Sequence, residues 1–325
     1  MRIASSSRAV LWASPAALIL VCAVPARLFA QAWLPPKGAS SVSIGLQSFH
    51  VPWHLEADGS EDERADIRIN NVTAETTYGL SDKIALDFGL PYVASRYGGD
   101  APESARDDGT YYATFQDFRL NVRYAMSNRR GLALTPSLAV VLPSHEYDTL
   151  AHTAPGRHLY EVGLGLNAGR SLAPALPDTY VHAYYSYALA QRLVHEGLDL
   201  SLNRSNADVE VGHLLTSALT VRGFASWQRT HGGLEWTEED LGVHEDIHDR
   251  AARASYWRLG AGVTYSVNGS LDVSASVLTT VAGRNTHKVG GVVLSTTWTF
   301  GRGGAIVGVV QNTSQRVAPG MVRAR

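Results

Sequence analysis

Residues 257–267 read Trp-Arg-Leu-Gly-Ala-Gly-Val-Thr-Tyr-Ser-Val, and every second side chain is apolar. The apolar set begins at Trp257 and ends at Val267, and arginine, glycine, threonine and serine occupy the positions between. A helix would scatter these side chains around its surface, whereas a strand sorts them onto two faces. The stretch therefore predicts a β-strand with one apolar and one polar face.

The same alternation recurs at residues 83–92, 117–126 and 160–169, and more weakly elsewhere. Extending each stretch to the nearest turn signal predicts about twelve antiparallel strands. Their expected ranges are 41–56, 66–79, 83–97, 110–127, 131–147, 158–170, 178–193, 206–215, 218–231, 250–267, 271–283 and 288–300.

The connections between these strands alternate in length, which favours a membrane barrel over a soluble sandwich. Short turns such as 80–82 and 268–270 alternate with longer polar loops such as 98–109 and 232–249, although the 284–287 connection is short. Short turns on one side and long loops on the other are typical of outer-membrane barrels. Aromatic residues near strand ends, which such a barrel needs as interfacial belts, are Tyr78, Tyr92, Tyr124, Trp227, Trp257, Tyr265, Trp298 and Phe300.

The N-terminus has the features of a secretory signal peptide over residues 1–30. Arg2 and Arg8 precede an apolar stretch, and Ala30 offers a small residue for cleavage before Gln31. The single cysteine, Cys22, lies inside this signal, so the mature chain would need no disulfide. Removing three arginines and no acid takes the formal charge from −2 to −5, which argues against a nucleic-acid partner.

Four segments follow from these signals. We expect a signal peptide at 1–30, a periplasmic segment at 31–40, an outer-membrane barrel at 41–300 and a tail at 301–325. Thr299-Phe300 resembles the aromatic ending that the barrel-assembly machinery reads, so this machinery and outer-membrane lipid are expected partners. A further strand at 304–311 is the alternative for the tail.

Three stretches resemble the outer-membrane family named for the MetA pathway of phenol degradation. They are 71–93, with Tyr78-Gly79-Leu80-Ser81-Asp82-Lys83 at its turn; Gln116-Asp117-Phe118-Arg119 leading to Arg123-Tyr124; and Val140-Val141-Leu142-Pro143-Ser144. The resemblance implies an outer-membrane barrel that acts as a transport channel. It suggests small aromatic or other organic compounds as solutes, and it names no particular substrate.

His244-Glu245-Asp246-Ile247-His248 matches the H-E-x-x-H pattern of zinc proteases. That chemistry requires a packed helix, a third ligand and a cleft, and the match lies in an acidic loop between two expected strands. We therefore predict no metal cofactor and keep His244 and His248 only as weak metal candidates.

The expected polar face of the strands supplies the candidate pore lining. Charged side chains are costly against lipid and tolerated in a watery lumen, where they tune selectivity. The inward candidates are Asp87, Asp117, Arg119, Arg123, Glu161, Glu210, Arg222 and Arg258, with His182 and Tyr184 as further possibilities. Either these groups attract solutes, or they pair with one another and fill the barrel.

An outer-membrane hydrolase and a non-conducting structural barrel are the rival functions. A twelve-stranded phospholipase uses a Ser-His pair near its outer rim, and Ser205 and His195 lie near one expected loop. No spacing marks them as a nucleophile and its base. We therefore expect a channel for passive passage of small solutes, with no catalytic residues and no cofactor.

Overall fold

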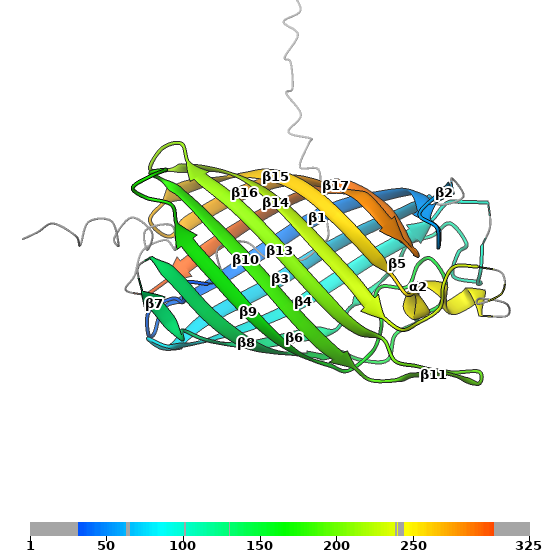
Figure 1. Ribbon diagram of the computed structural model, residues 1–325. Helices are drawn as coiled ribbons and strands as arrows, with labels where there is room; N and C mark the ends of the chain where they lie inside the picture. The colour runs from blue at the N-terminus through cyan, green and yellow to red at the C-terminus, as the bar shows by residue number, and fades with distance from the viewer. Residues whose placement is uncertain are drawn as a thin grey trace, which may run out of the picture.

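The computed structural model describes residues 32–301, apart from 63–65, 101, 130, 238 and 240–243. The expected signal peptide and the tail beyond Gly301 lie outside the described residues. In the described part, twelve long antiparallel strands close into one barrel (Figure 1). They are β1 (Ser40–Leu55), β3 (Ile67–Ser81), β4 (Ile84–Tyr97), β6 (Phe118–Tyr124), β8 (Leu132–Leu142), β9 (Glu161–Ser171), β10 (Thr179–Ala190), β13 (Asn203–Leu214), β14 (Leu219–His231), β15 (Ser255–Asn268), β16 (Leu271–Arg284) and β17 (Thr286–Phe300).

The barrel closes because the first long strand pairs with the last. Ser40 lies opposite Phe300, and the register continues to Leu55 opposite Thr286, with an irregularity between His50 and Trp53. Every other long strand pairs with its neighbours in chain order, so no long strand is left with an open edge. Closure satisfies the backbone hydrogen bonds that lipid could not satisfy.

Short elements lie at the two ends of the barrel. β7 (Ser127–Arg129) belongs to the end with short turns, which we call the turn end. At the opposite end, the loop end, lie β2 (Glu61–Asp62), β5 (Tyr112–Phe115), the β11–β12 hairpin (Leu193–His195, Leu198–Leu200), the 3-10 turn η1 (Glu245–Ile247) and α2 (His248–Ala251). Figure 1 shows β2, β5, β11 and α2 together at this end, opposite β7.

Several expected strands are shorter than the alternation predicts, and three of them illustrate the causes. The strand expected at 110–127 is interrupted after Phe115, because Asp117 turns inward to accept a hydrogen bond from Tyr147. The strand expected at 131–147 ends at Leu142, since Pro143 offers no N–H to a ladder. The strand expected from 250 begins only at Ser255, and the residues before it form η1 and α2.

The apolar faces of the strands point outward. Exposed aliphatic side chains cover the outer wall, among them Leu86, Leu120, Val122, Leu138, Leu164, Leu166, Val209, Val211, Leu259, Val263, Val273, Val277 and Leu294. An exposed apolar band of this extent on a closed barrel is the surface that lipid covers.

Aromatic side chains border this band near both ends of the strands. Tyr78, Tyr124, Tyr265, Trp298 and Phe300 are exposed toward the turn end, and Tyr92 and Trp257 are exposed toward the loop end. Trp227 packs beside Trp257, with ring centroids 6.3 Å apart. These positions match the interfacial belts of an outer-membrane barrel. Among the described residues, no helix is long and apolar enough to cross a membrane.

Candidate pore

The inner wall of the barrel carries polar side chains because they alternate with the lipid-facing ones. On β16, Asp272, Ser274 and Ser276 are buried while Val273 and Val277 are exposed. Ser274 bonds to Ser295 of β17 across the wall, with the two hydroxyl oxygens 2.8 Å apart. The wall can therefore bind water or polar solutes wherever space remains between the side chains.

Asp87 and Arg123 form an ion pair on this wall near the turn end. The Arg123 guanidinium donates to both carboxylate oxygens, at 2.7 and 2.8 Å, and its side chain is only 5% exposed. Asn121 and Thr77 donate to the same carboxylate at 2.9 and 2.8 Å. The bidentate geometry fixes both groups against the wall.

Glu210 and Arg222 form a second buried pair on the neighbouring strands β13 and β14. Arg222 Nη1 lies 3.1 Å from Glu210 Oε2, and Arg222 Nη2 donates to Ser276 Oγ at 2.7 Å. The Tyr180 hydroxyl donates to the other carboxylate oxygen of Glu210 at 2.8 Å. Side chains from β10, β13, β14 and β16 therefore meet inside the barrel.

Glu161 and Asp117 lie closer to the loop end and bind partners from a loop and from β13. Arg157 Nη1 donates to Glu161 Oε1 at 3.1 Å, and Arg204 donates to Oε2. The Tyr147 hydroxyl donates to Asp117 Oδ1 at 2.6 Å. Burial, followed by repulsion from Arg204, lowers the pKa of Arg157 to about 9, so Arg157 is still charged at neutral pH.

Arg119 and Arg258 complete the expected pore lining. Arg119 lies on β6, where its register partner is Gly89 of β4. Arg258 is half-buried on β15, its guanidinium 4.1 Å from the ring centroid of Tyr256 and its Nε 3.4 Å from Thr280 Oγ1. Among the described residues no ion pair of Arg258 within 4 Å is found, and its contacts are the Tyr256 ring and Thr280 Oγ1.

The two further inward candidates also lie on the wall. His182 Nε2 is 3.3 Å from Asn167 Oδ1, and Tyr184 is buried beside Gly165. The expected residues therefore form several separate networks rather than one site. Asp87, Glu161, Glu210, Arg123 and Arg222 are held in ion pairs that brace the wall.

Apolar side chains fill part of the barrel toward the loop end. Phe49, Val51, Ile67, Tyr97 and Val289 pack together there and are almost fully buried. Beyond them, residues of the loops form a second apolar cluster, made of Leu159, Leu193, Leu202, Leu234, Ile247 and Ala251. We call this second cluster the loop cap.

The chain preceding β1 contacts the inner wall at the other end. Ala32 is 2% exposed, and its carbonyl oxygen accepts a hydrogen bond from Thr135 Oγ1 of β8 at 2.7 Å. The Trp33 ring covers Gly169 so closely that a Cβ there would lie 2.5 Å from it. Residues 32 and 33 of the segment expected in the periplasm therefore narrow the lumen.

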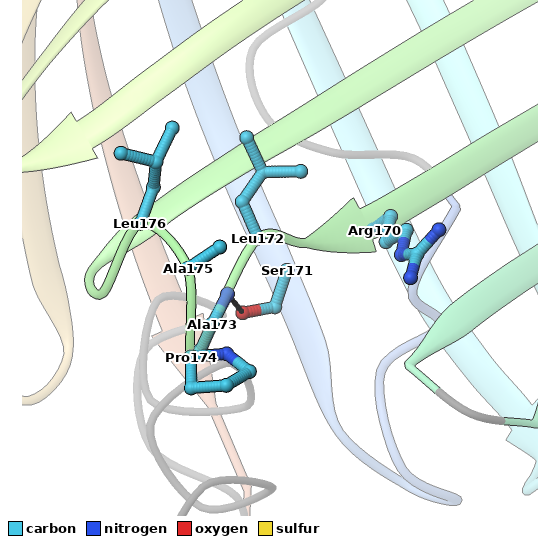
Figure 2. A pocket seen from close by; sticks show the side chains of 7 residues that line it. All are labelled: Arg170, Ser171, Leu172, Ala173, Pro174, Ala175 and Leu176. Carbon is cyan, nitrogen blue, oxygen red and sulfur yellow. Dashed lines mark hydrogen bonds between the residues drawn. The ribbon is translucent and has the colours of Figure 1, made fainter.

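A hollow at the turn after β9 has no comparable connection to the lumen networks. Figure 2 shows the side chains of Arg170 to Leu176 around it, all from one stretch of chain. Within this set, Ser171 Oγ accepts from the Ala173 N–H at 3.4 Å, and the Leu176 N–H donates to the Leu172 carbonyl oxygen at 3.0 Å. A hollow lined by a single turn carries no functional assignment.

The residues considered for a hydrolase do not assemble as that hypothesis requires. Ser205 bonds to His231, with Oγ and Nε2 2.8 Å apart, and also lies 3.2 Å from the Tyr185 hydroxyl. Ser205 is 3% exposed, and His231 has no carboxylate partner in the described part of the chain. His195 instead approaches Asp246, at 3.9 Å. The serine is shielded and its histidine lacks an orienting acid.

The two histidines of the H-E-x-x-H match separate into different clusters. His244 lies with His195 and Glu196, whereas His248 lies with His54, His152, Asp249 and His287. The backbone of residues 245–251 forms a 3-10 turn and one short helical turn rather than a helix that could place both rings on one face. The zinc-protease geometry is therefore absent from this segment.

Sequence reasoning missed the loop residues that bind the inner wall. Arg157 lies in an expected loop and Tyr147 at the very end of the strand expected at 131–147, so no local pattern marks either as a partner of the inner wall. Arg204 lies on the same face of β13 as the inward-facing Glu210. A predicted strand that began at Asn203 rather than at residue 206 would have included it. His54, His152 and His287 were missed because their neighbours are distant in sequence.

The fold and its outer surface define the chain as an outer-membrane β-barrel. Residues 64–296 match the family described as "Putative MetA-pathway of phenol degradation", and the chain belongs to this family. Comparison with curated protein sequences gives no match.

One solved structure supports the same fold, and others are similar to a lesser degree. An outer membrane channel from Pseudomonas putida F1 aligns with a TM-score of 0.66 at 12% identity, covering 83% of this chain and 98% of that one. A NanC porin gives a TM-score of 0.46 at 10% identity, covering 80% and 98%. LpxR from Salmonella typhimurium gives 0.44 at 12%, covering 81% and 100%.

Proposed function

We propose that this barrel is a channel for passive passage of small solutes across the outer membrane. The observation that carries the proposal is a closed barrel with lipid-facing apolar side chains outside and a polar, charged wall inside. Membership of the phenol-degradation family supports transport, and the likeness to an outer membrane channel supports the fold. Export by a signal peptide cleaved near Ala30 and insertion by the barrel-assembly machinery belong to the same proposal.

Small aromatic or other organic compounds are the solutes we propose. The cluster of Phe49, Val51, Ile67, Tyr97 and Val289 gives the lumen an apolar section, and the polar wall continues beyond it. A path that is partly apolar and partly polar suits a small molecule with a ring and a polar group, because each part can be desolvated in turn.

Passage requires movement at both ends of the barrel. The loop cap lies over the loop end, and Ala32 and Trp33 lie against the wall toward the turn end. Loops and terminal segments are the parts of a barrel that move most readily, whereas the strands are fixed by their ladders. We therefore place the gates in these segments and the selectivity in the wall.

Planar bilayers test the channel directly through Arg258. The purified protein should produce discrete conductance steps, and Arg258→Glu should shift the reversal potential in a salt gradient toward cation selectivity, because an acid replaces a cation that no described acid neutralises. Arg192→Glu is the control, since Arg192 lies immediately before β11, has a side chain 58% exposed and is ion-paired with Asp199 of β12.

Two results would contradict the proposal. An absence of steps from both the wild type and the variants would indicate a non-conducting barrel. An equal shift from Arg192→Glu and Arg258→Glu would show that the lumen charge is not what the ions encounter.

A further inference from the structure

Four histidines and three acidic residues meet beneath the loop cap. His54 and His287 are register partners on β1 and β17, and their rings stack with centroids 4.9 Å apart. α2 brings His248 and Asp249 to the same place, and the loops after β4 and β8 bring Glu103, Asp107 and His152. The pore networks described above use none of these residues. We call this group the histidine cluster.

Three potential ligand atoms in the cluster already have the spacing of a metal site. Asp249 Oδ1 lies 3.2 Å from His248 Nε2 and 3.2 Å from His287 Nε2. A tetrahedral ion with bonds of about 2.0–2.1 Å holds its ligand atoms roughly 3.3–3.4 Å apart. The two distances from Asp249 therefore match such an ion, and the ligand atoms of all three residues lie within 4.8 Å of one another.

His54 can supply a fourth ligand. Its Nε2 is buried and has no hydrogen-bond partner among the described residues, a costly arrangement for a ring nitrogen. Ligand atoms of His54, His152 and His248 lie within 4.8 Å of one another, and those of His248, Asp249 and His287 form a second such group, so His54 reaches the site through the shared His248 and its ring must turn toward Asp249 and His287 to complete the ligand set. Coordination would satisfy this nitrogen without requiring a proton on it.

Acidic residues orient the rings of His248 and His152 by binding their Nδ1 atoms. Glu103 Oε2 lies 2.5 Å from His248 Nδ1, which leaves Nε2 facing Asp249. Asp107 Oδ2 lies 2.9 Å from His152 Nδ1 in the same way. A carboxylate on the far nitrogen of a ligating histidine is the usual outer shell of a zinc site, where it fixes the tautomer.

Aromatic rings close the cluster against water. Trp236 lies 5.2 Å from His54 and 5.1 Å from His248 between ring centroids, and Tyr97 stacks on His152 at 4.1 Å. These contacts hold the rings of His54, His152 and His248 in place.

We propose that the histidine cluster binds one divalent transition-metal ion of the Zn²⁺ class, with His54, His248, Asp249 and His287 as ligands. Imidazole and carboxylate donors select Zn²⁺ and its neighbours over Mg²⁺ and Ca²⁺, which prefer oxygen ligands alone. The bonds would join α2 to the ends of β1 and β17, and Glu103 would add the loop after β4. Such an ion would fasten α2, one part of the loop cap, to the rim of the barrel, and its binding does not depend on conduction.

Zinc titration of the full mature chain tests the site. The protein is purified through a tag without histidine, stripped with EDTA and titrated with Zn²⁺ against a chromophoric chelator. One Zn²⁺ should bind per chain, His287→Ala and Asp249→Asn should abolish that binding, and Glu103→Gln should weaken it by about 10- to 100-fold. Co²⁺ in the same protein should give the visible absorption of a tetrahedral site, and His54→Ala should change that spectrum.

The matched control removes the other histidine cluster. His195→Ala combined with His244→Ala eliminates the group of His195, Glu196 and His244 and should leave the tight binding unchanged. Heat-modifiable gel migration confirms that each variant retains the barrel. Loss of binding in this control, or unchanged binding in His287→Ala and Asp249→Asn, would overturn the proposal. Absence of stoichiometric binding would mean that the cluster is a network of histidine–carboxylate ion pairs without metal.

Discussion

Val277→Arg should lower the free energy of unfolding of the barrel in lipid vesicles by about 2–4 kcal/mol, the cost of a cation near the bilayer midplane. Val277 lies midway along β16, is 56% exposed and has Ala261 and Val292 as its register partners. Its surroundings are hydrocarbon if the outer wall faces lipid. Urea unfolding in vesicles, followed by tryptophan fluorescence, measures the change.

Val194→Arg is the matched control for this substitution. Val194 is 73% exposed on β11, in the hairpin beyond the loop end, where water surrounds the side chain. The same chemical change there should leave stability unaltered. Equal effects at the two valines would show that the wall around Val277 faces water.

Arg123→Met should cost about 3–5 kcal/mol of stability, because it leaves the carboxylate of Asp87 buried without its cation. The two side chains are 5% and 21% exposed, and both oxygens of Asp87 accept from the guanidinium. Combining Arg123→Met with Asp87→Asn should recover much of the loss, since the uncompensated charge then disappears. Urea unfolding of the wild type, the two single variants and the double variant gives a double-mutant cycle, which measures the interaction between the two side chains.

Arg192 provides the comparison for this pair. Its ion pair with Asp199 has both side chains more than half exposed, so Arg192→Met should not measurably change stability. Additive effects of Arg123→Met and Asp87→Asn would contradict a direct interaction between the two side chains.

The barrel could be predicted from the sequence because its signal is local. Alternation along residues 257–267 reports which side of one strand faces lipid, whatever the rest of the chain does. The predicted strand positions are wrong where a contact with a residue distant in the sequence interrupts the strand. The break at Asp117 depends on Tyr147, 30 residues later, and no pattern near Asp117 reveals it.

The sequence predicts which side chains lie on the inner wall, but it does not predict which partners they bind. The alternation of polar and apolar positions places Asp87 and Arg123 on the polar face of their strands. The ion pair between them depends on the register of β4 with β6, which the sequence does not reveal. The histidine cluster was less accessible still. The H-E-x-x-H match marked His248, but its neighbours His54 and His287 become visible only when β1 pairs with β17.

Nitroxide scanning along β16 tests the arrangement of the two faces most directly. Cys22 is the single cysteine of the sequence, so with Cys22 replaced by serine, single cysteines at 273–281 can be labelled cleanly in vesicles. Collisions with oxygen, which dissolves in lipid, should peak at the odd positions, and collisions with a water-soluble nickel chelate should be lowest there. A nickel-accessible label at 277, or accessibility without a period of two, would contradict a barrel that presents this face to hydrocarbon.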